Sequence, residues 1–299
     1  MKKFLLNIVL FFLAFLILDK LFGVYFDYLN SHAKGGDTAN QYYICKQTHD
    51  DILIFGSSRA NHHYVTSIIE DSLRMSCYNC GKDGNGIILH YGRYKLLTER
   101  YTPKLIIYDL VAAFDIEYND NLRYLDQLKP YADESIIIKL FNDISPTEKY
   151  KLYSKTYRYN TKFIQMIGDN IMPQQTSLKG YKPIYNTMNY EPKISRNTDI
   201  HKSDIIKLKY LENFIKDAQD KGIKLVFMIS PQYKAKSSSA YNSAKKIIQR
   251  YNVPLFDFLA DPQIAYNRKY FSDIFHLNNN GAEAYTNEII KYIKSQLEK

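Results

Sequence analysis

Two short segments at opposite ends of the chain contain residues that could together attack an ester. Ser58 lies in "IFGSSRA", where an apolar run meets a Gly-Ser-Ser turn, and "FSDIFHLNNNGAEAY" carries Asp273 and His276. A serine hydroxyl becomes a good nucleophile when a neighbouring base takes its proton. An acid three residues before a histidine can accept the Nδ1 hydrogen and leave Nε2 facing the serine. These spacings predict a nucleophile, a base and an orienting acid.

Each of these residues alone also has an ordinary explanation. Ser58 suits the N-cap of a helix, and His276 suits a loop in which neighbours satisfy its ring. The functional hypothesis makes a further demand that neither explanation makes: Ser58 and His276 must lie at the same edge of one structure.

Apolar runs alternate with helical patterns along most of the chain. The sequence predicts strands at Asp51–Phe55, Met75–Gly81, Pro103–Leu110, Ile223–Pro231 and Val253–Phe258, and helices at Arg59–Leu73, Ile87–Glu99, Asp204–Asp220, Ser239–Tyr251 and Asn280–Leu297. Such alternation implies a parallel sheet with helices on both faces. Ligands of these sheets bind at the carboxyl ends of the strands. Ser58, Gly81, Ala112–Asp115 and the segment around His276 all follow strands and should share that rim.

The N-terminus predicts a membrane anchor. Residues Phe4–Leu18 are apolar, and continuing through Phe26 reaches the length of a bilayer core. We expect an uncleaved signal-anchor over residues 1–26, with Lys2 and Lys3 inside and the rest of the chain outside the cytoplasm. A cleaved signal peptide ending near "SHA", Ser31 to Ala33, remains the alternative. Residues 27–50 are expected to form a linker. Residues 51–299 are expected to form one domain, with a mostly helical insertion at about 117–198.

Composition argues against several other classes of protein. The net charge of +9 is scattered without a basic block, so we expect no nucleic-acid partner. Cys77 and Cys80 have CxxC spacing but lack a second ligand pair for zinc, and a disulfide from Cys45 to either stays open. His62 and His63 lack a third ligand and are interpreted as rim residues. We therefore expect neither a metal nor a cofactor.

"IFGSSRA" and "DIFHLNNNGAEAY" resemble the first and last motif blocks of the SGNH (GDSL-like) hydrolases, in particular the membrane-anchored cell-envelope members. The resemblance covers about residues 50–115 and 204–297. It implies a flavodoxin-like three-layer α/β/α sandwich with a five-stranded parallel sheet. It also implies that Ser58 is the nucleophile, His276 the base and Asp273 its orienting acid. The backbone N–H groups of Ser58 and Gly81 would hold the oxyanion.

The chain departs from this family in its third block, where "YDLVAAFDI" lacks the expected asparagine. Loss of one oxyanion donor can cost about 10²–10³ in rate. Asn85 or Asn119 could replace it, and Asp115 aligns with the acid that follows. Arg59 could clamp a carboxylate or phosphate of the substrate, pair with an acid such as Asp115, or simply be solvated. Arg59, Asn85 and Asp115 are the candidate substrate-binding residues.

The expected function is that of a serine esterase, O-acyl esterase or acyltransferase. Its partner would be an acylated polysaccharide or another cell-envelope polymer, and it would act through an acyl-enzyme on Ser58. The alternative is a non-catalytic module of the same fold that binds glycan or partner proteins.

Overall fold

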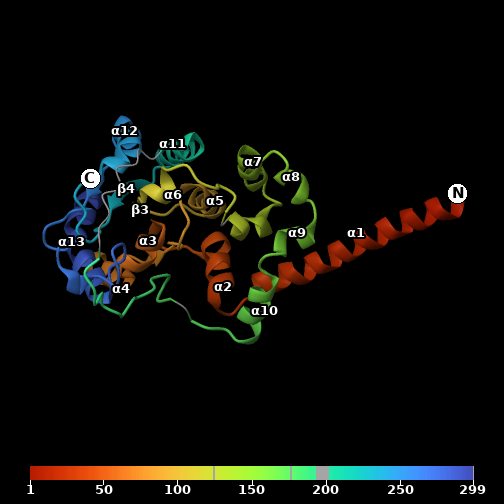
Figure 1. Ribbon diagram of the computed structural model, residues 1–299, viewed down its shortest axis with the longest axis horizontal. Coiled ribbons are helices and arrows are strands. Elements are labelled where there is room, and N and C mark those ends of the chain that lie inside the picture. The colour runs from red at the N-terminus through yellow and green to blue at the C-terminus, as the bar shows by residue number, and fades with distance from the viewer. Residues whose placement is uncertain (124, 176, 193–201, 299) are drawn as a thin grey trace. The chain divides into compact units, whose positions relative to one another are not determined.

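The computed structural model describes residues 1–123, 125–175, 177–192 and 202–298 (Figure 1). Contacts between Cα atoms divide them into two compact units. The helical unit comprises residues 1–45 and 121–176, and the sandwich unit comprises residues 46–120 and 177–299.

A five-stranded sheet forms the centre of the sandwich unit. Its strands are β1 (Ile52–Gly56), β2 (Cys77–Asn79), β3 (Leu105–Asp109), β4 (Lys224–Ile229) and β5 (Leu255–Asp257). All pairings are parallel, and the order is β2-β1-β3-β4-β5. This is the flavodoxin-like order, with a switch point between β1 and β3. The predicted fold class is therefore confirmed.

Helices cover both faces of this sheet. They are α3 (Ser58–His63), α4 (Thr66–Leu73) and α13 (Asn279–Leu297) on one face, and α5 (Ile87–Thr98) and α11 (Ile205–Asp220) on the other, with α6 (Ala112–Asp115) and α12 (Asn242–Arg250) beside them (Figure 1). Alternate strand residues point to opposite faces. Ile54 and Ile107 therefore pack with Tyr285 of α13, while Phe55 meets Phe214 of α11.

The helix predicted at Arg59–Leu73 is two helices. Tyr64 and Val65 between them have extended backbone. The Val65 N–H donates to the Thr286 hydroxyl of α13 at 3.0 Å. Because a long-range partner satisfies this donor, the chain breaks its helical ladder there, which periodicity alone could not reveal.

The helical unit contains α1 (Lys2–Ser31), α2 (Gly36–Tyr42), α7 (Ser135–Ile144), α8 (Glu148–Lys151), α9 (Lys155–Tyr159) and α10 (Phe163–Ile171). A 3₁₀ helix at Leu125–Tyr131 lies between α6 and α7, and a π-helix at Tyr43–Gln47 follows α2. The segment expected to be a linker, residues 27–50, is thus mostly helical. Its first part stays helical because Phe26 and Leu29 of α1 pack against Tyr159 and Met166.

The predicted insertion, residues 117–198, divides between the units. Residues 121–175 are mostly helical, as expected, and belong with α1, whereas residues 177–192 run along the sandwich unit. There the Lys179 carbonyl accepts from the Asn79 N–H, and the Met188 N–H donates to the Phe271 carbonyl. Residues 193–198 lie outside the described residues.

One helix in the described ranges, α1, is long and apolar enough to cross a membrane. A signal sequence would satisfy the same criteria, so composition does not separate the two. Cys45, Cys77 and Cys80 are buried free thiols, so no disulfide joins Cys45 to Cys77 or Cys80.

Candidate active site

Ser58 is the first residue of α3, directly after the tight turn that leaves β1. Gly56 has φ +137°, and a Cβ there would lie 2.4 Å from the Asp109 carbonyl oxygen. Only glycine fits this close approach without strain. As the first helical residue, Ser58 has a backbone N–H that α3 itself does not satisfy.

His276 lies in a loop that ends at α13. The Asp273 carboxylate accepts the N–H groups of Phe275 at 2.7 Å and His276 at 2.9 Å, which closes a local turn. The Ser272 N–H donates to the His276 carbonyl at 2.9 Å. Asn278 then caps α13 by accepting the Gly281 N–H at 3.0 Å. This explains why the Asn-rich turn follows the histidine.

The structure brings Ser58, His276 and Asp273 together. The Ser58 hydroxyl lies 2.8 Å from His276 Nε2, and His276 Nδ1 lies 2.8 Å from Asp273 Oδ2. If Nδ1 donates to the carboxylate, Nε2 is left with the lone pair that can accept the Ser58 hydrogen. All three side chains are partly exposed, so a solvent-borne substrate can reach them.

The Asp273 carboxylate is suited to stabilise a protonated histidine. Partial burial works to raise its pKa, but hydrogen bonds from the His276 ring and the Phe275 N–H outweigh burial and lower it. The group therefore stays charged at neutral pH. An ionised partner at Nδ1 fixes the tautomer and stabilises the imidazolium that forms when Nε2 takes a proton.

A buried chain of hydrogen bonds holds the loop that carries His276. His63 is fully buried, and its Nε2 accepts the Leu277 N–H at 3.0 Å. Its Nδ1 then carries the hydrogen and donates to Ser230 Oγ at 3.0 Å. Ser230 donates onward to Asp109 Oδ2 at 2.6 Å. Burial, then the nearby His276 and Arg59, holds the pKa of His63 well below its usual value, so its ring stays neutral.

Sequence reasoning placed His63 only on the rim and missed Ser230. The one local sign of Ser230 was its position at the end of the buried run "KLVFMIS". Its partners come from two other segments of the chain, α3 and the end of β3, so no spacing in the sequence could indicate them.

The structure contradicts the substrate-clamp hypothesis for Arg59. The side chain is buried, and its guanidinium donates to the Ser230 carbonyl at 3.1 Å, the Leu110 carbonyl at 3.3 Å and the Tyr241 hydroxyl. Its nearest acid is Asp109, not Asp115. Burial raises the pKa of Asp109 to about 6, although Arg59 and Ser230 work to lower it. Arg59 thus ties the ends of β3 and β4 together.

Asp115 also belongs to the scaffold. It is fully buried and accepts the Tyr108 hydroxyl and the Val111 N–H, both at 2.7 Å. Burial raises its pKa to about 6. It closes the turn that leads into α6 and cannot reach a bound polymer, so this substrate-binding prediction is wrong.

The two asparagines considered as replacements for the missing amide have structural partners. Asn85 is buried and donates to the Asp83 carbonyl at 2.8 Å. Asn119 donates to the Ala113 carbonyl at 2.7 Å and accepts from Lys207 at 2.8 Å. These bonds shape the loops after β2 and β3, so the structure gives no support to a substrate-binding role for Asn85.

The Gly81 N–H has a partner within the protein. It donates to Asn79 Oδ1 at 2.9 Å. A Cβ at Gly81 would lie 2.5 Å from the Asn61 nitrogen, so the glycine allows the loop after β2 to pack directly on α3. The Gly81 N–H, the expected oxyanion donor, is therefore beside the site. It must release Asn79 before it can hold a substrate oxygen.

His62 links that loop to the segment after the helical unit. Its Nδ1 lies 2.6 Å from the Lys182 carbonyl, and its Nε2 lies 3.3 Å from Asp83 Oδ1, which also accepts from Asn61 at 2.7 Å. Burial works to raise the pKa of Asp83, but the bond from His62 and that from Asn61 lower it. Among the residues described, no group of three or more His, Cys, Asp or Glu could hold a metal ion.

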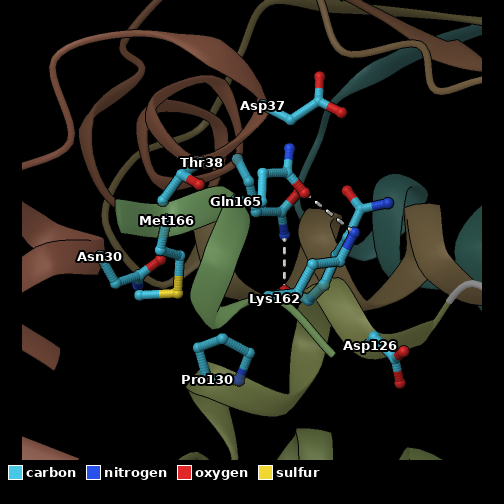
Figure 2. Close-up of a pocket in the computed structure, with 10 residues that line it drawn as sticks. Asn30, Asp37, Thr38, Asp126, Pro130, Lys162, Gln165 and Met166 are labelled. Atoms are coloured by element: carbon cyan, nitrogen blue, oxygen red, sulfur yellow. Dashed lines mark hydrogen bonds between the residues drawn. The ribbon is translucent and has the colours of Figure 1, made fainter. Parts of the chain in front are cut away.

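The helical unit has its own small hollow (Figure 2). Lys162, Gln165 and Met166 line it from α10 and the residue before that helix, and Asp126 and Pro130 line it from the 3₁₀ segment. The Thr38 hydroxyl at its edge donates to Asp169 at 2.6 Å. Asp169 also accepts the Thr38 N–H at 3.1 Å, so this carboxylate satisfies the start of α2.

The chain matches no described protein family and no curated protein. Solved structures that resemble it include the psychrotrophic esterase EstA from Pseudoalteromonas sp., with 16% identity, a TM-score of 0.44 and coverage of 83% of this chain and 98% of that chain. TesA shares 11% identity with a TM-score of 0.44, covering 82% and 98%. The acetyl xylan esterase AlAXEase shares 12% with a TM-score of 0.40, covering 81% and 99%. At these identities the likeness does not identify an activity or a substrate for this chain.

Proposed function

We propose that the chain is an SGNH-type serine esterase that works through an acyl-enzyme on Ser58. The observation that carries this proposal is the 2.8 Å separation of the Ser58 hydroxyl from His276 Nε2, with Asp273 on the other ring nitrogen. Nucleophile and base within hydrogen-bond reach, with the base oriented by a third group, is the arrangement that activates a serine.

The reaction follows from these contacts. Ser58 Oγ bonds to the ester carbonyl carbon while His276 Nε2 takes the hydroxyl proton. His276 returns that proton to the leaving alcohol as the ester C–O bond breaks. Water or a sugar hydroxyl then attacks the acyl carbon, giving its proton to His276. His276 passes that proton to Ser58 Oγ as the bond between Oγ and the acyl carbon breaks. The Ser58 N–H faces the developing oxyanion, and the Gly81 N–H can join it after releasing Asn79.

An acylated cell-envelope glycan is the substrate that we propose. The apolar α1, with Lys2 and Lys3 at its start, favours an anchor whose following domain faces away from the cytoplasm. The second half of α1 also packs within the helical unit, where Phe26 meets Tyr159. Removal of α1 would expose that packing, which supports an uncleaved anchor over a signal peptide.

A fluorophosphonate probe tests the esterase. The full-length protein in detergent should react at one serine, and peptide mass analysis should locate the adduct at Ser58. Ser58→Ala should remove labelling, whereas Ser57→Ala, at the neighbouring buried hydroxyl, should retain it. Folded wild-type protein that fails to react, or that reacts elsewhere, contradicts the proposal. Intact mass after incubation with envelope glycans would then name the acyl group.

A non-catalytic envelope module is the second candidate, and specific observations favour it. The third block lacks its asparagine, and the Gly81 N–H is bonded to Asn79. A module of this kind would bind glycan equally well as wild type and as Ser58→Ala, and neither form would react with the probe.

A further inference from the structure

The outer face of α1 determines how much of this helix a membrane can hold. Residues Phe4–Leu18 are exposed around the whole helix. From Asp19 onward one stripe is buried, but Leu21, Phe22, Val24 and Tyr25 on the other side remain exposed. A span from residue 4 to residue 25 rises about 33 Å, which matches a hydrocarbon core of about 30 Å. Residues 4–18 alone rise about 22 Å and fall short.

Within this span, the acid Asp19 lies a short distance before the end that faces away from the cytoplasm. Asp19 precedes Tyr25 by six residues, a rise of about 9 Å. An ionised side chain in that position requires partners, because hydrocarbon offers none. Asp19 has three of them: the Ser154 hydroxyl at 2.7 Å, the Lys155 N–H at 2.9 Å and the Thr156 N–H at 2.8 Å.

Those partners are the N-cap and the first turn of α9. The start of α9 therefore lies at the same depth in the membrane as Asp19. Gly23 brings the two segments into direct contact, since a Cβ there would lie 2.6 Å from Lys155 Cβ. Both helices belong to the helical unit, and Figure 1 shows α9 against the second half of α1. The corner between α8 and α9 therefore lies within about 9 Å of the outer end of the span, at the boundary between acyl chains and headgroups.

The side chains at this corner match a membrane interface. Tyr150 is 66% exposed and Tyr153 is 77% exposed, so neither is needed for packing. Lys149 lies over the Tyr150 ring at 5.1 Å, and Lys151 pairs with Glu148. Tyrosine is enriched where apolar chains meet headgroups, and lysines near that level are attracted to anionic lipid.

We propose that the α8–α9 corner, residues 149–156, is a lipid-contacting surface that docks the helical unit onto the bilayer crossed by α1. Tyr150 and Tyr153 lie among the headgroups, and α9 shields Asp19 from the acyl chains. The occupant is the phospholipid interface itself, because the corner is continuous with the span. This inference rests on the anchor in the proposed function and not on the esterase, so failed serine labelling would leave it standing.

The chain contains no tryptophan, so a single introduced tryptophan reports its own surroundings. Full-length Tyr153→Trp should be placed in vesicles of phosphatidylcholine and phosphatidylglycerol, with and without bromine near the top of the acyl chains. Tyr185→Trp is the matched control, because Tyr185 of the sandwich unit is also 77% exposed. We expect the Tyr153→Trp emission to shift to the blue and to be quenched more strongly than the control, on the order of twofold.

The proposal would be overturned if Tyr153→Trp were quenched no more strongly than Tyr185→Trp. The corner would then be a surface that binds a glycan or a protein. Tyr150→Trp provides a second position if Tyr153→Trp misfolds. Mass analysis of the membrane-bound protein gives an independent check. A chain that retains residues 1–26 is expected, and a chain that begins after Ala33 would also overturn the proposal.

Discussion

The backbone N–H of Leu277 donates to Nε2 of His63 at 3.0 Å, so a buried histidine holds the residue that directly follows the candidate base. His63 keeps this role only as a neutral ring with its hydrogen on Nδ1, and Ser230 is the acceptor that selects this tautomer. The position of His276 against Ser58 therefore depends on residues that never touch a substrate.

The first prediction concerns Ser230. In Ser230→Ala the His63 Nδ1–H loses its acceptor, and a buried unsatisfied donor costs about 1–3 kcal/mol. We expect the rate of fluorophosphonate labelling to fall by about 10-fold to 100-fold, since small misplacements of reacting groups cost that much. Ser230→Thr keeps the hydroxyl and should restore the rate, including its dependence on pH. Ser243→Ala, whose hydroxyl bonds Ser203, is the control. Normal labelling in Ser230→Ala would show that the buried chain is purely structural.

A second prediction concerns the orienting acid. In Asp273→Asn the amide can donate to His276 Nδ1, which puts the ring hydrogen on Nε2 and removes the lone pair that faces Ser58. By analogy with other Ser-His-Asp sites, labelling should slow by about 10⁴-fold while the fold is retained. The measurement is labelling rate beside a thermal unfolding curve. Asp71→Asn, at an exposed acid of α4, should change neither quantity.

A third prediction uses a substitution of Arg59 to distinguish a structural role from a substrate-binding role. Arg59→Met removes the donor to the Ser230 and Leu110 carbonyls and the cation near buried Asp109, and each buried polar group left without its partner costs about 1–3 kcal/mol. We expect a lower melting temperature of the sandwich unit. Arg250→Met removes an exposed arginine and should leave the melting temperature almost unchanged. Were Arg59 a substrate clamp, its variant would melt normally and only bind substrate more weakly.

The buried carboxyl group of Asp115 predicts a pH dependence of stability. Burial raises its pKa from 3.8 to about 6, so the folded protein binds the proton more tightly than the unfolded chain does. The stabilisation is fully present below pH 3.8 and is lost as pH rises through about 6, amounting to about 3 kcal/mol. Asp115→Asn has no proton to lose there. Its unfolding free energy, measured between pH 4 and pH 7, should decline less steeply than that of wild type, and equal slopes would contradict the assignment.

The fold could be predicted because its signals are local. Buried strands such as Leu105–Asp109 read as unbroken apolar runs, and Asp204 and Gly222 mark the two ends of α11. The pair Asp273 and His276 could be predicted for the same reason, since one short turn contains both. Ser58 was identifiable because the strand, the glycine and the helix start are adjacent in the chain.

The errors concern residues whose partners lie far away. Arg59 follows the nucleophile, so its position suggested the rim, but the Ser230 and Leu110 carbonyls and the Tyr241 hydroxyl draw its guanidinium into the core. Asp115 was assigned from alignment to a motif, whereas Tyr108 and Val111 determine where its carboxylate lies. The polar residues after Phe26 suggested a linker, because the helices that cover α1 come from beyond residue 120.

The Ser58–His276 contact joins residues separated by 218 positions. A ribosome must therefore add 218 residues after Ser58 before this serine can meet its candidate base, and a product that stops earlier carries an ordinary alcohol. Under the proposed function, acyl transfer by such shorter products is prevented without any inhibitor, because the segment around His276 is what activates Ser58.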